Sequence, residues 1–409
     1  MKVEDLVADF LRENNYLKTL ETFEREYGKA FEGPVKEGLS EIVQDRYATQ
    51  QIALQDEKRL ENDEDPRIEV LQKQVTEWKL PYPRRPTRIA RDINELVLST
   101  CLINYKDQDY LFCATVKGKI FAKKLPQDVT LAVHEIPGES AAIKKLIPFG
   151  SSQLLVLTMN GALHLCNYQF DKVKLQVLYS ETTHQRLLVD AKAIGLLCVT
   201  LGWDRKIKVF HIENQVTFLC DYELPLQGTA FDLIEYRDQI MLVVGISDSS
   251  VLHVLTLHDN SLRFVYRIAL CEAQYMVDLF SPRSISILQT SLSPLVAVGT
   301  SHEPFMRIIV TRLDIPRDRA TIRRDLVLRN INSHLSQNKF SQSLITWRVL
   351  PDHSTCGIWA LGDDGLFKGI DLITGAVYQN EGFEGRAKCF VHSDSFFIAS
   401  GSCSVMWLP

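Results

Sequence analysis

The chain has 409 residues, 45% of them hydrophobic and 24% charged, which excludes a largely disordered protein and predicts more than one structural unit. Its nine cysteines include no C-x-x-C pair, which argues against a disulfide framework or a thiolate zinc site and favours a reducing compartment. Residues 1–80 carry 12 basic and 19 acidic side chains, a net charge of −7, whereas the remainder carries 34 and 32, a balance that gives no support to nucleic-acid binding.

Neither a secretory signal nor a membrane span is predicted. The N-terminus MKVEDLVADF is charged and lacks a long apolar run, unlike a signal peptide. No stretch approaches the roughly 18 apolar residues that a membrane span requires. We therefore expect a cytoplasmic and/or nuclear protein without a membrane partner.

Two short amphipathic helices are predicted at the N-terminus. Apolar side chains recur at helical spacing up to Asn14-Asn15, and they resume after this break until Gly28, a plausible C-cap. The two stripes consist of Val3, Leu6, Val7, Phe10 and Leu11, followed by Tyr16, Leu20, Phe23 and Tyr27. Because each helix has only about three turns, the pair buries too little apolar surface to be stable alone. A second copy of the chain is the simplest partner.

These helices resemble the LisH motif, a helical dimerisation module. The residues that carry the resemblance are Leu6-Val7-x-x-Phe10-Leu11-x-x-x-Asn15-Tyr16-x-x-Thr19-Leu20-x-x-Phe23-x-x-Glu26. Asn15 replaces a frequent Gly of the family, and Asn tolerates the left-handed conformation; Leu20 replaces a frequent Ala. The resemblance implies a homodimer through residues 1–34. A helical hairpin docked on the rest of the chain is the alternative.

Residues 35–80 are predicted to be helical. A charged helix is expected over 36–61, with Leu39, Ile42, Val43 and Tyr47 on one side. Asp65 and Pro66 then form a helix start. The spacing of Ile68, Leu71, Val75 and Trp78 suggests a short coiled coil, or a segment that packs on the following domain or on a partner.

A proline- and arginine-rich linker is predicted at 81–87. Its prolines cannot continue a helix. Four arginines of this region, Arg84, Arg85, Arg88 and Arg91, would suit a nuclear signal or a phosphate contact, but a solvated linker is favoured.

From residue 88 to 409 the sequence predicts a mainly β fold. Seven similar hairpins recur at steps of 43, 43, 44, 55, 61 and 38 residues, and a step near 43 is the length of one four-stranded propeller blade. Their turns are expected at Gly118, Gly161, Asp204, Asp248, Glu303, Asp364 and Ser402. A seven-bladed β-propeller is therefore predicted, with residues 87–91 supplying the strand that closes the ring. A pair of β-sandwiches is the structural alternative.

Two hairpins resemble WD repeats. The third runs from Leu201 through Gly202-Trp203-Asp204 to Phe210, and the last from Ala399 to Trp407. No Gly-His dipeptide occurs, so we expect the buried His, Ser, Asp and Trp network of typical WD blades to be absent.

No catalytic constellation is found, and no cofactor or metal site is predicted. The sequence lacks a phosphate-cradling glycine-rich loop, H-E-x-x-H and G-x-S-x-G. Gly362-Asp363-Asp364-Gly365 is interpreted as a hairpin turn rather than as part of a propeller hydrolase, and the ten histidines show no metal-ligand spacing.

An insert at 312–342 is longer than a blade connection requires, and a helix is expected over 321–335. Its arginines could make bidentate contacts with the carboxylates or phosphates of a partner; the alternative is an outer strand with solvated charges. The predicted partner-binding residues are Arg317, Arg319, Arg323, Arg324 and Arg329.

We therefore expect a non-catalytic dimeric scaffold whose propeller binds other proteins. The domain order resembles that of dynein regulators of the lissencephaly type, of transducin-β-like co-repressor subunits and of propeller subunits of ubiquitin ligases. Each resemblance implies a different complex, and a propeller hydrolase is the least favoured reading.

Overall fold

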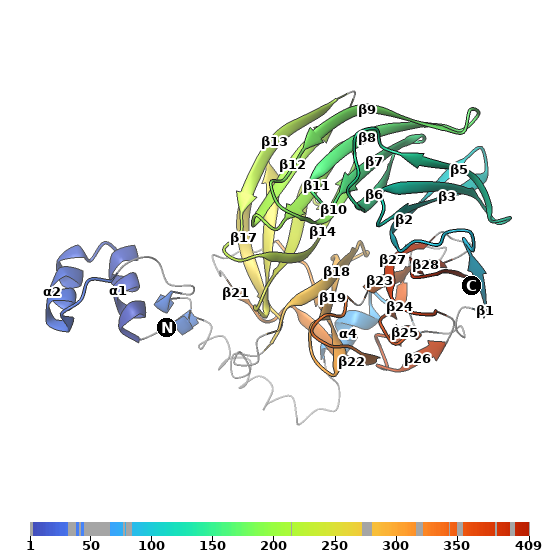
Figure 1. Ribbon diagram of the computed structural model, residues 1–409. Coiled ribbons are helices and arrows are strands. Elements are labelled where there is room, and N and C mark those ends of the chain that lie inside the picture. The colour runs from blue at the N-terminus through green and yellow to red at the C-terminus, as the bar shows by residue number, and fades with distance from the viewer. Residues whose placement is uncertain are drawn as a thin grey trace.

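Seven radial β-sheets form a closed ring, with two helices beside it (Figure 1). The computed structural model describes residues 3–31, 38–40, 42–44, 66–76, 78, 84–213, 215–271, 280–315, 322–342, 344–349, 355–380, 383–392 and 397–408. We number the sheets as blades 1 to 7 in chain order. Six blades have four strands and blade 4 has five. The predicted fold class and blade number are confirmed.

Blade 1 contains β2 (Val97–Tyr105), β3 (Gln108–Thr115), β4 (Lys119–Lys124) and β5 (Val129–Glu135). Blade 2 contains β6 (Ile143–Phe149), β7 (Gln153–Thr158), β8 (Ala162–Gln169) and β9 (Lys174–Thr182). Blade 3 contains β10 (Leu188–Ile194), β11 (Leu197–Gly202), β12 (Lys206–Ile212) and β13 (Val216–Glu223). Blade 4 contains β14 (Gly228–Tyr236), β15 (Gln239–Ile246), β16 (Val251–His258), β17 (Ser261–Ala269) and β21 (Ile322–Arg323), and blade 5 contains β18 (Pro282–Leu288), β19 (Leu295–Thr300), β20 (Phe305–Arg312) and β22 (Val327–Ser336). Blade 6 contains β23 (Leu344–Val349), β24 (Thr355–Leu361), β25 (Phe367–Asp371) and β26 (Val377–Asn380). Blade 7 contains β27 (Ala387–His392), β28 (Phe397–Gly401), β29 (Ser404–Leu408) and β1 (Arg84–Ile89).

The turns between the second and third strands occur at all seven predicted positions. Gly161 illustrates why small residues stand there: its φ is +90°, and an added Cβ would lie 2.4 Å from the carbonyl oxygen of His184. Only glycine adopts this conformation without strain.

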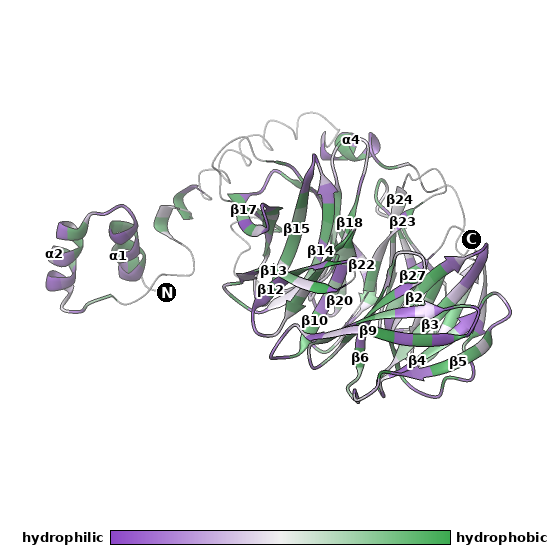
Figure 2. Cartoon of the chain, turned by 90° about the horizontal axis from the view of Figure 1, so that it is seen from above, coloured by the Kyte–Doolittle hydropathy of each residue, from purple (hydrophilic) through white to green (hydrophobic). Residues whose placement is uncertain are grey.

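The hydrophobic core is divided into clusters between neighbouring blades. Leu155 and Leu165 of blade 2, for example, pack with Cys198 and Phe210 of blade 3. Figure 2 shows the hydrophobic colour concentrated along the strands. Because each blade buries both of its faces, a loss of packing in one blade weakens its neighbours as well.

Strand β1 closes the ring. It pairs antiparallel with β29 of blade 7, with Ile89 opposite Ser404. It begins at Arg84, three residues before the predicted closing segment, so the end of the predicted linker belongs to the sheet. Immediately after it, the Ala90 amide donates to both carboxylate oxygens of Asp128 at 2.9 Å, which ties the closing strand to blade 1.

Blade 3 contains a buried hydrogen-bond network of His184, Asp204 and Thr200. His184 Nδ1 lies 3.0 Å from both carboxylate oxygens of Asp204, and His184 Nε2 lies 2.9 Å from Thr200 Oγ1. The expectation that such a network is absent is therefore wrong in this blade. The expectation rests on the absence of a Gly-His dipeptide, but in this blade Thr183 takes the place of the glycine before the histidine. The threonine fits there because its hydroxyl donates to the Gly161 carbonyl at 2.8 Å.

The segment before the linker packs on the propeller itself. Helix α4 (Pro66–Gln72) buries Leu71, and Val75 follows in the same hydrophobic cluster, which belongs to blades 5 and 6. The Thr76 amide donates to the Thr355 carbonyl at 2.9 Å. The coiled-coil prediction is therefore wrong for residues 66–78, whose apolar side chains are covered by their own domain, as the alternative stated.

Trp78 occupies a slot in blade 6. Its ring lies over Gly357 and Gly369, where an added Cβ would come within 2.9 and 2.5 Å of it. Trp359 meets it edge-on at 5.1 Å, and the Arg348 guanidinium lies 4.3 Å from its centre. A tryptophan fits here because the two glycines leave room for it.

The insert after β20 is extended where the structure describes it. It reaches back to blade 4, where β21 pairs in parallel with β17, and returns as β22, the outer strand of blade 5. The helix expected over 321–335 is therefore wrong. Along β22 the buried residues Leu328, Ile331, Ser333 and Leu335 largely alternate with exposed ones, which is the periodicity of a strand packed on one face.

The two N-terminal helices are α1 (Val3–Glu13) and α2 (Leu17–Tyr27), as predicted. Asn15 takes a left-handed φ of +58° between them, and Gly28 caps α2 at φ +75°. In Figures 1 and 2 the hairpin lies outside the ring. Of the helix predicted over 36–61, residues 39–40 and 42–44 are described and helical, and Gly38 is described but not helical; the others lie outside the described residues.

Candidate protein-binding face

One face of the ring carries all seven turns between second and third strands, together with the loops that join consecutive blades. We call it the turn face. The opposite face carries the connections between first and second strands. Helix α4 and the residues after it contact that opposite face, because Thr290 Oγ1 donates to Gln74 Oε1 at 2.6 Å and Thr76 binds Thr355. The turn face is therefore not covered by this segment.

Large apolar side chains are exposed on the turn face. Trp203, in the blade 3 turn, is 49% exposed, and Phe340, between blades 5 and 6, is 71% exposed. Leu187, Val116 and Phe305 are exposed on the same face. Exposed aromatic residues of this kind are the usual energetic centres of protein interfaces.

The loop that presents Phe340 is held in place by polar contacts. The Arg283 guanidinium donates to the carbonyls of Asn338, Lys339 and Ser341 at 2.9, 2.8 and 2.7 Å. The Ser341 hydroxyl in turn donates to Asp363 at 2.8 Å. Phe340 is thus pre-organised for contact, which reduces the entropic cost of binding.

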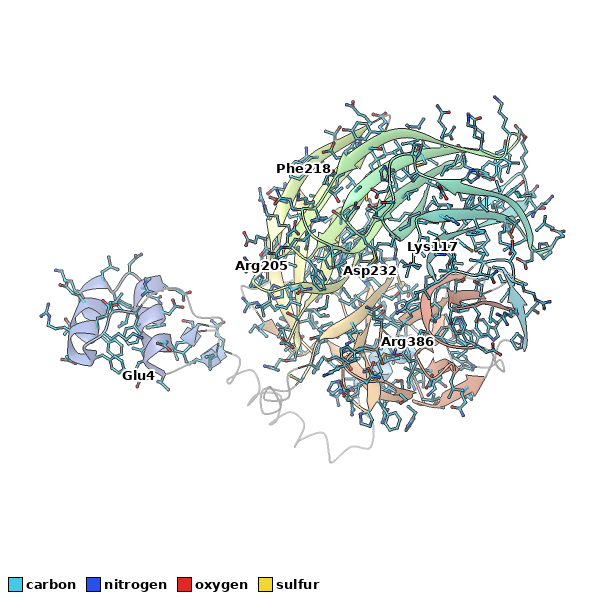
Figure 3. The ribbon with its side chains drawn as sticks, viewed as in Figure 1. Glu4, Lys117, Arg205, Phe218, Asp232 and Arg386 are labelled. Carbon is cyan, nitrogen blue, oxygen red and sulfur yellow. The ribbon has the colours of Figure 1, made fainter. Side chains whose placement is uncertain are left out.

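Charged residues line the inner strands of blades 2 to 4. Lys145 Nζ lies 2.9 Å from Asp190 Oδ1, and Lys192 Nζ lies 3.3 Å from Asp232 Oδ1. Burial alone would raise the pKa of Asp190, but Lys145 and Lys192 outweigh it and lower that pKa. Figure 3 labels Asp232, which lies towards the middle of the ring. These pairs join three consecutive blades around the channel.

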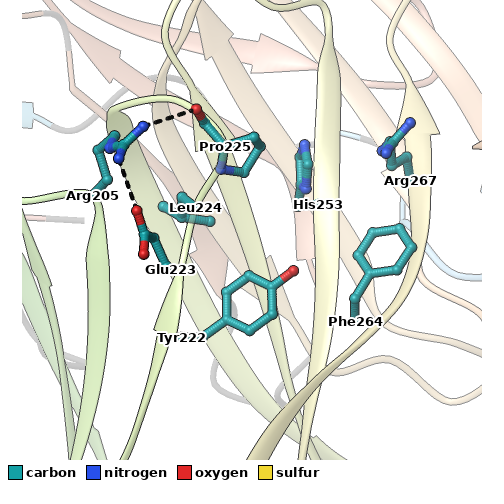
Figure 4. Close-up of a pocket in the computed structure, with 8 residues that line it drawn as sticks. All are labelled: Arg205, Tyr222, Glu223, Leu224, Pro225, His253, Phe264 and Arg267. Atoms are coloured by element: carbon teal, nitrogen blue, oxygen red, sulfur yellow. Dashed lines mark hydrogen bonds and ion pairs between the residues drawn. The ribbon is translucent and has the colours of Figure 1, made fainter. Parts of the chain in front are cut away.

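A pocket of about 490 Å³ lies between the outer parts of blades 3 and 4 (Figure 4). Arg205 at its edge binds Glu223 at 2.8 Å. His253 lies inside it between Pro225 and Phe264, and burial, followed by the nearby Arg267, lowers the pKa of His253 to about 4. His253 is therefore neutral at physiological pH, and the pocket combines aromatic walls with the charged side chains of Arg205, Glu223 and Arg267.

The predicted arginines of the insert bind within the chain where they are described. Arg323 makes a bidentate contact with Asp325 at 2.8 Å for each bond. Arg324 donates to the Cys271 carbonyl, and Arg329 donates to the Leu372 carbonyl at 3.0 Å. Arg317 and Arg319 lie outside the described residues. Binding of a partner through these arginines stays a prediction.

The predicted dimerisation stripe is only partly covered within one chain. Leu20 is buried, whereas Val3, Tyr16 and Tyr27 are exposed; the other members, Leu6, Val7, Phe10, Leu11 and Phe23, are half-buried. Phe23 and Tyr27 form a small aromatic cluster with Phe31, at centroid distances of 5.2 to 6.3 Å. The hairpin therefore presents apolar surface to solvent.

Within the described ranges, no helix has both the length and the apolar character needed to span a bilayer. No three His, Cys, Asp or Glu side chains in those ranges are grouped so as to hold a metal ion. Asp364 accepts hydrogen bonds from the amides of Leu366 and Ser336 at 3.1 and 3.3 Å, as a turn residue does.

Two family models match the chain: one described as UCP007778, beta-propeller domain, over residues 61–407, and one described as UCP007778, LisH domain, over residues 1–32. A similar protein, Uncharacterized protein YGR117C of Saccharomyces cerevisiae, is 24% identical over 414 residues, covering 91% of this chain and 85% of the yeast protein. A similar solved structure is Chaetomium thermophilum Sqt1 bound to the N-terminus of the ribosomal protein L10. It has a TM-score of 0.55 at 12% identity and covers 76% of this chain and 84% of Sqt1.

Proposed function

The chain belongs to the UCP007778 family of proteins with a LisH domain and a beta-propeller domain, and on this premise we propose that it is a non-catalytic dimeric scaffold that binds other proteins. In this proposal the LisH helices join two chains, and the turn face of each propeller binds a partner. We further propose that it acts in the cytoplasm, the nucleus or both.

The exposed aromatic residues of the turn face carry this proposal. Trp203 and Phe340 expose large apolar surface on the propeller, and Phe340 stands on a loop fixed by Arg283. The similar fold of Sqt1 is seen bound to the N-terminus of a ribosomal protein, which supports the view that a ring of this kind can bind a protein segment.

Substituting both aromatic residues tests the role of the turn face. We expect Trp203→Glu with Phe340→Glu to lose co-purifying proteins by roughly tenfold or more, since each anchor at a hot spot contributes about 2 kcal/mol or more. Affinity purification with quantitative mass spectrometry measures the loss. The matched control is Leu178→Glu with Phe218→Glu, two exposed apolar residues on the outer strands β9 and β13. Retention of the same proteins in the first variant would contradict this role.

Charging the apolar stripe tests the dimer. We expect Phe10→Asp with Phe23→Asp to change the mass in solution from twice the 46.7 kDa of one chain to that of a single chain, because a buried carboxylate without a partner is strongly unfavourable. Light scattering coupled to size-exclusion chromatography measures this. The control Asn14→Asp with Thr22→Asp adds the same charge at exposed positions and should leave the dimer intact. If the first variant keeps the parent mass, the helices are not the dimer contact.

A further inference from the structure

The inner strands of six blades share a structural irregularity at the turn face. In each, the register with the second strand shifts near the start of the strand, so that one extra residue is inserted. The six extra residues are Leu98, Lys144, Val189, Thr229, Arg283 and Lys388. Three are basic and none is acidic, and all six are half-buried. They surround the mouth of the central channel.

Two of the basic residues lie on either side of blade 1. Lys144 is on β6 and Lys388 is on β27, and the inner strand β2 contacts both of these strands. Arg386, next to the start of β27, is balanced by Asp363, because its Nε lies 3.5 Å from Asp363 Oδ2. Lys144 and Lys388 therefore carry the positive charge of this sector of the channel mouth.

Lys144 has no hydrogen-bond or ion-pair partner among the described residues. The nearest acid, Asp190, is bound at 2.9 Å by Lys145. Burial, and then Lys145 and Lys388, lower the pKa of Lys144, while Asp190 opposes this. Among the described residues, Lys388 donates a hydrogen bond to the neutral Gln342, at 3.3 Å. Burial lowers the pKa of Lys388, and the nearby Asp363 opposes this. Placing like charges together in a partly desolvated site costs free energy unless an anion compensates them.

We propose that an acidic segment of a partner protein binds at this channel mouth, with its carboxylates at Lys144 and Lys388. This inference rests on the proposed protein-binding role of the turn face. A protein segment is favoured over a free polyphosphate because apolar residues, including Leu187, Trp203 and Phe340, are exposed on the same face, and these suit the neighbouring side chains of a peptide. The described residues just before the propeller, α4 and Trp78, pack on the opposite face, so they do not cover the mouth.

The test measures binding of two fluorescein-labelled peptides to the full-length protein by fluorescence anisotropy at low ionic strength. In the first peptide Asp and Glu alternate with Leu and Phe; in its twin, Asn and Gln replace the acids. We expect only the acidic peptide to bind, and Lys144→Gln with Lys388→Gln to weaken it by roughly tenfold. The matched control Lys172→Gln with Lys174→Gln removes two exposed lysines of the opposite face and should bind like the parent. A thermal melt of each variant confirms folding.

Three results would overturn the inference: no binding of the acidic peptide, equal binding of its neutral twin, or unchanged binding by the Lys144→Gln, Lys388→Gln variant. Tight binding of inositol hexakisphosphate without binding of the acidic peptide would assign the mouth to a free polyphosphate instead. If the peptide fails while Trp203→Glu with Phe340→Glu still loses its co-purifying proteins, only the acidic-segment inference is wrong. If that variant also retains its proteins, the proposed function of the turn face is wrong as well.

Discussion

Replacing Trp78 with alanine is expected to lower the free energy of unfolding by about 3–5 kcal/mol, the usual cost of truncating a buried tryptophan. Trp78 is only 7% exposed, and it packs against Trp359 and Arg348 of blade 6. Its loss leaves a cavity over two glycines that cannot fill it. Urea denaturation followed by circular dichroism measures the change.

Two further variants make this prediction specific. Trp203→Ala removes an exposed tryptophan and should change the free energy of unfolding by less than about 0.5 kcal/mol. Gly369→Ala places a methyl group 2.5 Å from the Trp78 ring, so it should destabilise the parent more than it destabilises Trp78→Ala. Equal effects of Gly369→Ala in both backgrounds would show that Trp78 does not occupy the slot.

Replacing both Asp92 and Asp128 with asparagine is expected to lower the free energy of unfolding by about 3 kcal/mol, because it leaves the ammonium group of Lys123 buried without a counter-charge. The Lys123 side chain is fully buried, and its Nζ binds Asp92 and lies 3.0 Å from Asp128 Oδ1. Burial would raise the pKa of Asp92, but hydrogen bonds from Lys123 and Thr130 lower it. The stabilisation that the ionised Asp92 gives the folded state is therefore present at neutral pH and is lost as the pH falls below about 4.

Removing the buried charge should reverse the effect. Lys123→Met in the doubly neutralised background is expected to recover most of the lost free energy, because a methionine fits a space made for a lysine stem without needing a counter-charge. Asp107→Asn with Asp171→Asn, two exposed positions, provides the control for loss of charge alone. If Lys123→Met fails to rescue stability, the cost lies in lost hydrogen bonds rather than in the uncompensated ammonium group.

Features with a local sequence signature could be predicted. The helices α1 and α2 follow from apolar spacing and from Asn15 and Gly28, which take left-handed conformations. The seven hairpin turns follow from alternating strands around small or polar residues. Ring closure followed from the count of strands, because the last hairpin lacked a fourth strand and residues 87–91 could supply one.

Features that depend on contacts between residues distant in the sequence could not be predicted from the sequence. The slot for Trp78 is made by Gly357 and Gly369, almost 300 residues later, so apolar spacing alone does not distinguish a coiled coil from a segment packed on the propeller. For the arginine-rich insert, the pairing of β22 with β20 decides for a strand instead of the predicted helix, and this pairing is not visible in the local sequence. The closeness of Lys144 and Lys388 depends on how blades 2 and 7 flank blade 1, so the local sequence around each lysine does not reveal it.

The seventh blade combines β1 with the last three strands of the chain, and this arrangement affects how the protein unfolds. Arg84 pairs with Leu408, so that this contact spans the whole propeller; because a very long loop has to close, we expect the contact to form late in folding. Once formed, β1 is held near its partner strand by the anchored Trp78 a few residues earlier, which keeps its effective concentration high after any local detachment. We therefore expect a detached β1 to rejoin the sheet quickly, so that resistance to unfolding depends on this rebinding rate as well as on the equilibrium free energy.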